Sequence, residues 1–139
     1  MLGIGSQLAY GDGASPEVFT KIAEVTSIGG PGLARGTVDA TNLDSPDDYA
    51  EFIGGLKDGG EVTFDVNFIP ANSTQDQATG FLSFFEDGLT RNWRITFPDS
   101  PASVWNFAGV FINFSPTIVA DDKISGSATV KVSGKPTLT

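Results

Sequence analysis

The strict alternation of apolar and polar residues in the segment 61–69 constrains the fold of this chain more than any other feature. Its apolar positions are Val62, Phe64, Val66 and Phe68, and its polar positions are Glu61, Thr63, Asp65 and Asn67. Successive side chains of a strand point to opposite faces, so a period of two predicts a strand with one face on a core and the other open. Pro70 follows directly, and proline cannot continue a ladder of hydrogen bonds.

Other segments repeat this β pattern around one helical segment. The further predicted strands are 19–28, 37–41, 91–97, 104–114 and 124–132. Between residues 74 and 87, Phe81, Leu82 and Phe85 recur at helical spacing, and Gly88 supplies a helix stop. The sequence therefore predicts a mainly β fold of two packed antiparallel sheets, a sandwich or partly open barrel, with one flanking α-helix.

The length of 139 residues fits a single domain spanning residues 1–139. Residues 1–16 are rich in glycine and are interpreted as an N-terminal arm, and residues 134–139 as a short C-terminal tail. Residues 42–60 are interpreted as a long loop with at most one or two helical turns, because Gly54 and Gly55 oppose a helix. A connection this long is typical of a functional or mobile segment.

The composition excludes several kinds of active site. The chain contains no cysteine and no histidine, so disulfides, thiolate catalysis, Ser-His-Asp triads and Cys-His zinc sites cannot be built. The acid pairs Asp47-Asp48, Glu86-Asp87 and Asp121-Asp122 could bind calcium or act as glycosidase carboxylates. Each pair lies at a predicted turn or helix end, which favours a local structural role. We expect no enzyme activity, no cofactor and no metal.

The charge argues against nucleic-acid binding. Seventeen acidic and eight basic residues give a formal net charge of −9, and a surface of that sign repels phosphates. The basic residues are scattered along the chain, and no apolar run is long enough to cross a membrane as a helix. An acidic, β-rich domain with a glycine-rich arm and a long loop suits a protein that assembles with its neighbours.

Two stretches carry a resemblance to a known family. They are EVFTKIAEV at residues 17–25 and LDSPDDYAEFIGGLKDGGEV at residues 43–62. In this order they resemble the tail tube proteins of long-tailed, lambda-like bacteriophages. The resemblance implies two packed sheets flanked by a helix, and hexameric rings of identical subunits that stack into a hollow tube. It also implies a virion tail assembled in the host cytoplasm, whose channel conducts DNA without binding it specifically.

The resemblance further implies partners. The expected partners are copies of the chain itself, the tail terminator, the baseplate or tip proteins and the tape measure protein. Independently of the resemblance, Tyr49, Phe52 and Leu56 are apolar groups that need a partner surface, so they are expected to contact other subunits or rings. We also expect residues 1–16 and 42–60 to be mobile in the free subunit and ordered in the tube.

A channel wall requires residues that face away from the core. If the inner wall is a continuous sheet, the polar face of the segment 61–69 looks into the channel. Glu61 and Asp65 are therefore expected to face the lumen, and Asp39, which alternates with Val38 and Ala40, is expected to do the same. The alternative is that these acids are ordinary solvent-facing residues of an outer sheet.

Two other functions compete with the tail tube. One is a ring protein like those of type VI secretion, which has a similar fold. The other is a carbohydrate-binding or receptor-binding β-module, whose site would need exposed aromatic side chains. The candidate aromatics are Trp93, Trp105, Phe107, Phe111 and Phe114. Strand alternation assigns most of them to the core instead.

Overall fold

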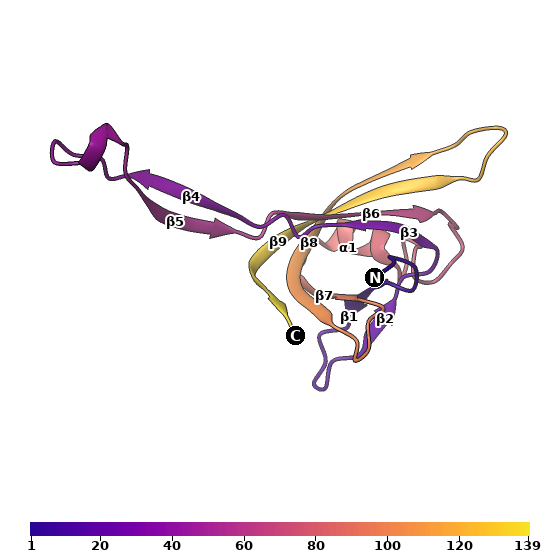
Figure 1. The fold of residues 1–139 in the computed structure, drawn as a ribbon. Coiled ribbons are helices and arrows are strands. Elements are labelled where there is room, and N and C mark those ends of the chain that lie inside the picture. The colour runs from indigo at the N-terminus through magenta and orange to yellow at the C-terminus, as the bar shows by residue number, and fades with distance from the viewer.

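A computed structural model describes residues 1–139 as a curled antiparallel sheet from which a long hairpin projects (Figure 1). The strands of the sheet are β1 (Gln7–Gly11), β2 (Phe19–Lys21), β3 (Val25–Gly29), β6 (Glu61–Asn67), β7 (Arg91–Thr96), β8 (Val104–Thr117) and β9 (Ser125–Leu138). Their order across the sheet is β2-β1-β7-β8-β9-β6-β3. The hairpin consists of β4 (Ala34–Asp39) and β5 (Phe52–Asp58), and the single α-helix is α1 (Phe81–Asp87).

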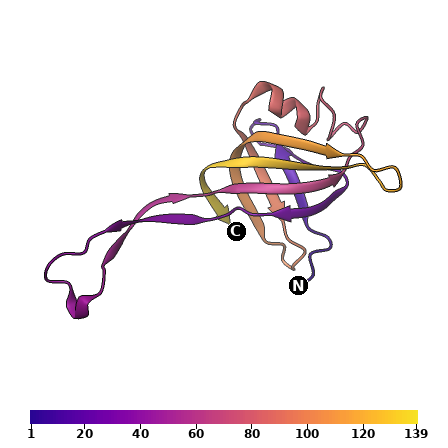
Figure 2. The same ribbon diagram turned by 90° about the horizontal axis from the view of Figure 1, so that it is seen from above.

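The sheet curls so that its two halves pack across one core. Strands β2, β1 and β7 form one layer, β9, β6 and β3 form the other, and α1 covers the core from the side (Figures 1 and 2). The 14-residue strand β8 joins the layers, and its register with β9 shifts between Asn106 and Ala108 and again between Phe111 and Asn113. Such irregularities increase the local twist, which lets one strand serve both layers. The mainly β prediction with antiparallel sheets and one flanking helix is confirmed.

The core is built largely from aromatic side chains. Phe81 of α1 stacks on Phe111 of β8 with ring centroids 5.6 Å apart, and it meets Phe64 of β6 edge-on at 5.7 Å. Trp93 is fully buried, and its indole N–H donates to the carbonyl of Gly109 over 3.3 Å. Phe107 and Phe111 are buried as well, and Trp105 and Phe114 are partly buried against the core. The aromatic residues that could have formed a sugar platform therefore pack in or against the core.

The helix is shorter than the predicted segment 74–87 because a polar turn takes the place of its first part. The carboxylate of Asp76 accepts the backbone N–H groups of Thr79 and Gly80 at 2.7 and 2.8 Å. Side-chain acceptors of this kind compete with helical hydrogen bonding, so the helix begins only at Phe81.

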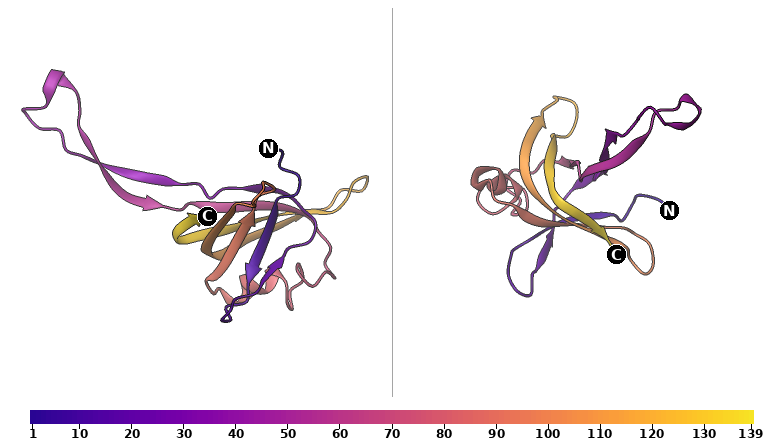
Figure 3. Two further views of the ribbon diagram at one scale, coloured as in Figure 1. Left: turned by 60° about the horizontal axis from the view of Figure 1, so that its bottom comes forward. Right: turned by 90° about the vertical axis from the view of Figure 1, so that its left-hand side faces the viewer.

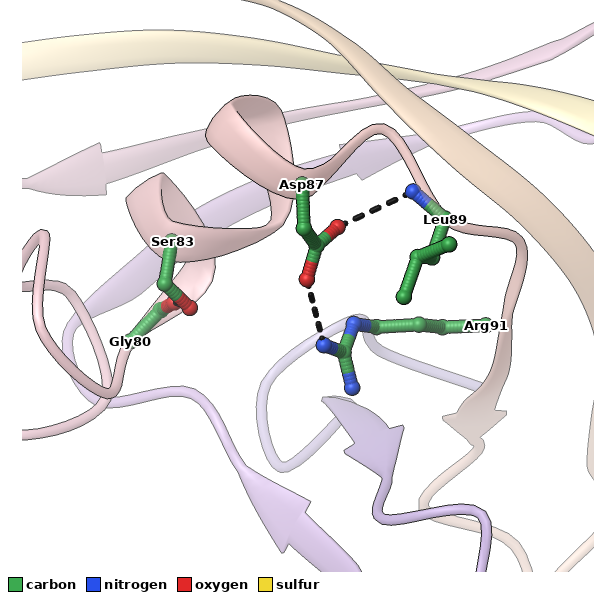
Figure 4. A network of polar contacts seen from close by, with 5 residues as sticks. All are labelled: Gly80, Ser83, Asp87, Leu89 and Arg91. Atoms are coloured by element: carbon green, nitrogen blue, oxygen red, sulfur yellow. Dashed lines mark hydrogen bonds and ion pairs between the residues drawn. The ribbon is translucent and has the colours of Figure 1, made fainter.

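Both ends of the helix are fixed by short-range polar contacts (Figure 4). At its start, the Ser83 hydroxyl donates to the carbonyl of Gly80. At its end, Gly88 adopts the left-handed conformation, φ 63°, that commonly terminates helices. The Asp87 carboxylate then accepts the Leu89 N–H at 2.9 Å and the Arg91 guanidinium at 2.7 Å, which connects the helix to β7.

Gln75 attaches the polar turn to the sheet. Its side chain is fully buried, and its amide accepts from the N–H of Ile69 at 2.8 Å. The same amide donates to the carbonyls of Ala23 at 2.7 Å and Asn67 at 3.3 Å. Three backbone groups from two separate segments are thus satisfied by one side chain.

We expect Gln75→Ala to lower the free energy of unfolding by about 3 kcal/mol. The substitution leaves buried backbone groups without a hydrogen-bond partner, and each unsatisfied group costs roughly 1–3 kcal/mol. Urea denaturation followed by fluorescence measures the change. Gln77→Ala is the matched control, since Gln77 is exposed and bonds only Glu86. Equal stabilities of the two variants would show that the buried amide contributes little.

The structure corrects the predicted N-terminal arm and C-terminal tail. Within residues 1–16 lies β1, which pairs on both sides with β2 and β7 and buries Leu8 completely. The arm prediction is wrong because the surrounding glycines hide a strand of only five residues. Residues 134–139 likewise extend β9 as far as Leu138, where it pairs with Trp105.

The structure also corrects the predicted loop at residues 42–60. Residues 52–58 form β5, which pairs antiparallel with β4 from Ala34↔Asp58 to Asp39↔Phe52. The only helical element there is a single 3-10 turn at Pro46–Asp48. The hairpin is exposed on both faces (Figure 3), so β5 carries no alternation of apolar and polar residues and only its pairing reveals it. The predicted strand 37–41 overlaps only the end of β4.

Candidate functional site

The outward side of the β3-β6-β9-β8 layer is an open surface lined mainly by small polar side chains, which we call the polar face. It consists of Ser27, Glu61, Thr63, Asp65, Asn113, Ser115, Ser127, Thr129 and Lys131. The registers align these residues in rows across the four strands, for example Ser27, Asp65, Ser127 and Ser115. The alternation of β6 places Val62, Phe64 and Val66 in the core and so forces its polar residues outward.

Asp65 is held in the middle of one row. One carboxylate oxygen accepts the hydroxyl of Ser27 at 2.9 Å, and the other accepts the hydroxyl of Ser127 at 2.6 Å. The Asp65 carbonyl also accepts the Thr26 hydroxyl at 3.2 Å. The hydroxyls of the neighbouring strands thus hold the negatively charged carboxylate of Asp65 at the surface of the sheet.

Glu61 lies at the end of β6, opposite Lys131 of β9. Lys131 is the one basic residue of the polar face, and its ammonium group is engaged elsewhere. It donates to the carboxylate of Asp58 at 3.2 Å and to the carbonyl of Gly60 at 3.3 Å. The polar face therefore presents hydroxyls, amides and two carboxylates, and its single cation is neutralised.

The third acid expected at the lumen lies apart from the other two. Asp39 ends β4 in the hairpin, paired with Phe52, and its carboxylate accepts the Thr41 N–H at 2.8 Å. Arg94, on the polar side of β7, also lies off the polar face. Its guanidinium donates to the Asn106 side chain at 3.2 Å and lies 3.9 Å from the centroid of the Phe19 ring.

The hairpin carries a second open surface, which is apolar. Tyr49, Phe52 and Leu56 have exposed fractions of 74%, 59% and 92%. The structure adds exposed apolar residues that the sequence did not single out, among them Val38 and its cross-strand partner Ile53. Exposed apolar patches of this kind are typical of surfaces that contact another protein chain.

Sequence reasoning missed the contributions of β8, β9 and β3 to the polar face. The alternation of Ser127, Thr129 and Lys131 in the segment 124–132 was a signal for β9. No sequence signal placed Ser27 or Ser115 beside Asp65, because strand order joins them.

The structure contains no group of three or more acidic side chains arranged to hold a metal ion. It also contains no helix with the length and apolar character needed to cross a membrane.

A family comparison places the whole arrangement among known proteins. Residues 4–139 match the family model described as lambda phage tail tube protein. None of the curated protein sequences matches the chain.

Solved structures share the fold at low sequence identity. A chain in the virion of a native gene transfer agent particle has a TM-score of 0.76 at 17% identity, over 100% of this chain and 98% of the other. The tail of an empty gene transfer agent particle, refined with C6 symmetry, gives 0.74 at 18% identity over 95% of both chains. The SPP1 tail tube gives 0.72 at 8% identity, over 99% of this chain and 78% of the other.

Proposed function

The chain belongs to the lambda phage tail tube protein family, and from that premise we propose that its copies form hexameric rings that stack into a tube conducting DNA to the host. The protein is a structural subunit of a virion tail and not an enzyme. Of the three functions that the sequence left open, family membership favours the tail tube over a type VI-like ring and a carbohydrate-binding module.

The polar face carries the proposal. A tube that conducts DNA must not bind it, and each contact between a lysine and a phosphate releases counterions and adds affinity. The polar face meets this requirement, because its only cation, Lys131, is already paired with Asp58. Its hydroxyls offer neutral contacts, and Glu61 and Asp65 repel phosphates within a Debye length of about 8 Å at physiological salt.

In the proposed ring, the polar faces of six subunits join into one inner wall. Glu61 and Asp65 then face the lumen, while Asp39 is left out of the wall because it belongs to the hairpin. The ring symmetry is supported by the C6 symmetry of the structurally similar gene transfer agent tail. Tyr49, Phe52 and Leu56 contact neighbouring subunits or rings, since the hairpin projects beyond its own subunit (Figures 1 and 2).

The proposed contacts extend to the ends of the tube. There the stacked rings meet the tail terminator on one side and the baseplate or tip on the other, and the tape measure protein occupies the lumen during assembly. An exposed polar wall without free cations suits a channel that must release this protein as well as DNA.

Size-exclusion chromatography followed by electron microscopy of the purified protein tests the proposal. In physiological buffer we expect rings or tubes whose end-on views have sixfold symmetry and a central hole. A protein that stays monomeric at high concentration, or that forms closed particles without a channel, would contradict the proposed function.

A further inference from the structure

The root of the β4–β5 hairpin contains a basic groove in an otherwise acidic protein. The groove has a volume of about 550 Å³ and lies between the root of the hairpin and the last part of β9. Its charged lining residues are Arg35, Lys57, Lys135 and Asp58. Three of the eight basic residues of the chain thus line one groove, although the net charge is −9.

The cations of the basic groove have no carboxylate partner within the subunit. The two ion pairs of the structure join Arg91 to Asp87 and Lys131 to Asp58. Asp58 lines the groove, but its carboxylate already accepts the Gly60 N–H at 2.8 Å and binds the Lys131 ammonium. These bonds lower the pKa of the Asp58 carboxyl. The groove is therefore left with an uncompensated positive charge.

Two of these cations lie on paired positions of the hairpin strands. Arg35 and Lys57 are cross-strand partners, and like charges in such positions destabilise a strand pair. An arrangement of this kind favours binding of an anionic group that would relieve the repulsion.

The opposite end of the same hairpin is acidic. The segment 39–51 contains Asp39, Asp44, Asp47, Asp48 and Glu51 and no basic residue. None of these carboxylates forms an ion pair, and all but Glu51 are exposed. The hairpin thus has an acidic tip and a basic root.

The tip cannot reach its own root. At about 3.3 Å per residue, the paired strands and the tip loop extend roughly 35–40 Å from the root. A body of about 100 residues has a radius of gyration of about 13 Å, and hence a diameter of roughly 35 Å. The hairpin projects away from the body (Figure 1), and a hairpin about as long as the body is thick can reach the hairpin root of the next copy in a stack.

We propose that the acidic tip of one subunit docks into the basic groove of a second copy of this chain in the adjacent ring. The proposal rests on the proposed function, which supplies the stacked rings. The contact joins different surfaces of the two copies, so it does not close on itself and propagates along an open-ended filament. Leu43 and Tyr49 at the tip and Leu33 in the groove are exposed in the free subunit and add apolar area to the contact.

A charge exchange between tip and root tests the proposal. The root variant carries Arg35→Glu, Lys57→Glu and Lys135→Glu, and the tip variant carries Asp39→Lys, Asp44→Lys and Glu51→Lys, so that the sign of the charge is reversed at each end. The tip substitutions avoid Asp47 and Asp48, which have left-handed φ values of 56° and 64° at which a lysine side chain would be strained. A third variant combines all six substitutions.

Each of the first two variants should raise the critical concentration for tube formation by about tenfold or more, because like charges then meet at every ring junction. An equal mixture of the two variants should restore tubes, since each tip then finds a root of opposite charge. The combined variant should assemble alone for the same reason. Light scattering and electron microscopy measure assembly, and circular dichroism verifies that every variant is folded.

Normal assembly of the root and tip variants would overturn the docking while leaving the proposed tube intact. The docking is equally overturned if both variants are folded and defective but neither the mixture nor the combined variant recovers. Failure of the unmodified protein to form rings or tubes would instead refute the proposed function, and the docking with it.

Discussion

Replacing Phe52 and Leu56 with serine is expected to leave a folded subunit that no longer assembles into tubes. Both side chains are largely exposed in the subunit, so their loss should change the free energy of unfolding by less than about 0.5 kcal/mol. Each should be buried in a contact between subunits, where burial contributes about 1.5–3 kcal/mol. Every subunit repeats the loss, so the effect on a long tube is large.

Thermal denaturation and size-exclusion chromatography separate these two effects. The matched control is the pair Phe85→Ser and Leu89→Ser, which removes the same side-chain types at exposed fractions of 53% and 59% outside the hairpin. We expect the control protein to assemble and the hairpin variant to elute as a monomer with an unchanged melting temperature. Tubes of normal length from the hairpin variant would show that the contact lies elsewhere.

Reversing the charge of the polar face is expected to slow DNA ejection without preventing assembly. Glu61→Lys and Asp65→Lys replace two carboxylates of every subunit with two ammonium groups on a surface whose own lysine is neutralised. A wall of lysines would bind phosphates as the DNA passes. We expect ejection to slow by about tenfold or more at low salt and to recover as salt rises, because such contacts weaken steeply with ionic strength.

Particles assembled with the variant subunit and triggered in vitro provide the measurement, with DNA release followed by fluorescence at two salt concentrations. The control is Glu61→Gln with Asp65→Asn, which removes the charges while the introduced amide oxygen can still accept a hydrogen bond from Ser27 or Ser127. The control should eject DNA almost normally. Unchanged ejection from intact tubes carrying the lysines would place Glu61 and Asp65 outside the channel.

The sequence by itself determined the elements whose two faces meet different surroundings. In β6 and β7, one face packs on the core and the other is open, so the apolar and polar positions alternate visibly. That period indicates both the existence of β6 and the outward direction of Glu61 and Asp65. The helix is predicted for the same reason, but its predicted start is too early. The Asp76 carboxylate accepts backbone N–H groups in a turn before Phe81, and the spacing of apolar residues does not reveal that turn.

Only the tertiary structure revealed the strands that do not have one face on the core and the other in solvent, or that are too short to show a period. Strand β1 is short and glycine-flanked, and its place between β2 and β7 comes from partners distant in the chain. Strand β5 is exposed on both sides, so no apolar face marks it as a strand. Tyr49, Phe52 and Leu56 are three and four residues apart, which is the spacing of a helix, and only the pairing with β4 identifies the strand.

The same distinction applies to the candidate site. The acidic character of residues 39–51 is visible in the sequence, whereas the basic groove opposite it is not. Arg35, Lys57 and Lys135 are distant in the chain and come together where β4, β5 and β9 converge. Strand order likewise aligns Ser27, Asp65 and Ser127 into one row. The alternation of apolar and polar residues can be read along the chain, because it depends on adjacent positions. Strand pairing joins residues that are far apart in the sequence, and it decides which charges and hydroxyls become neighbours.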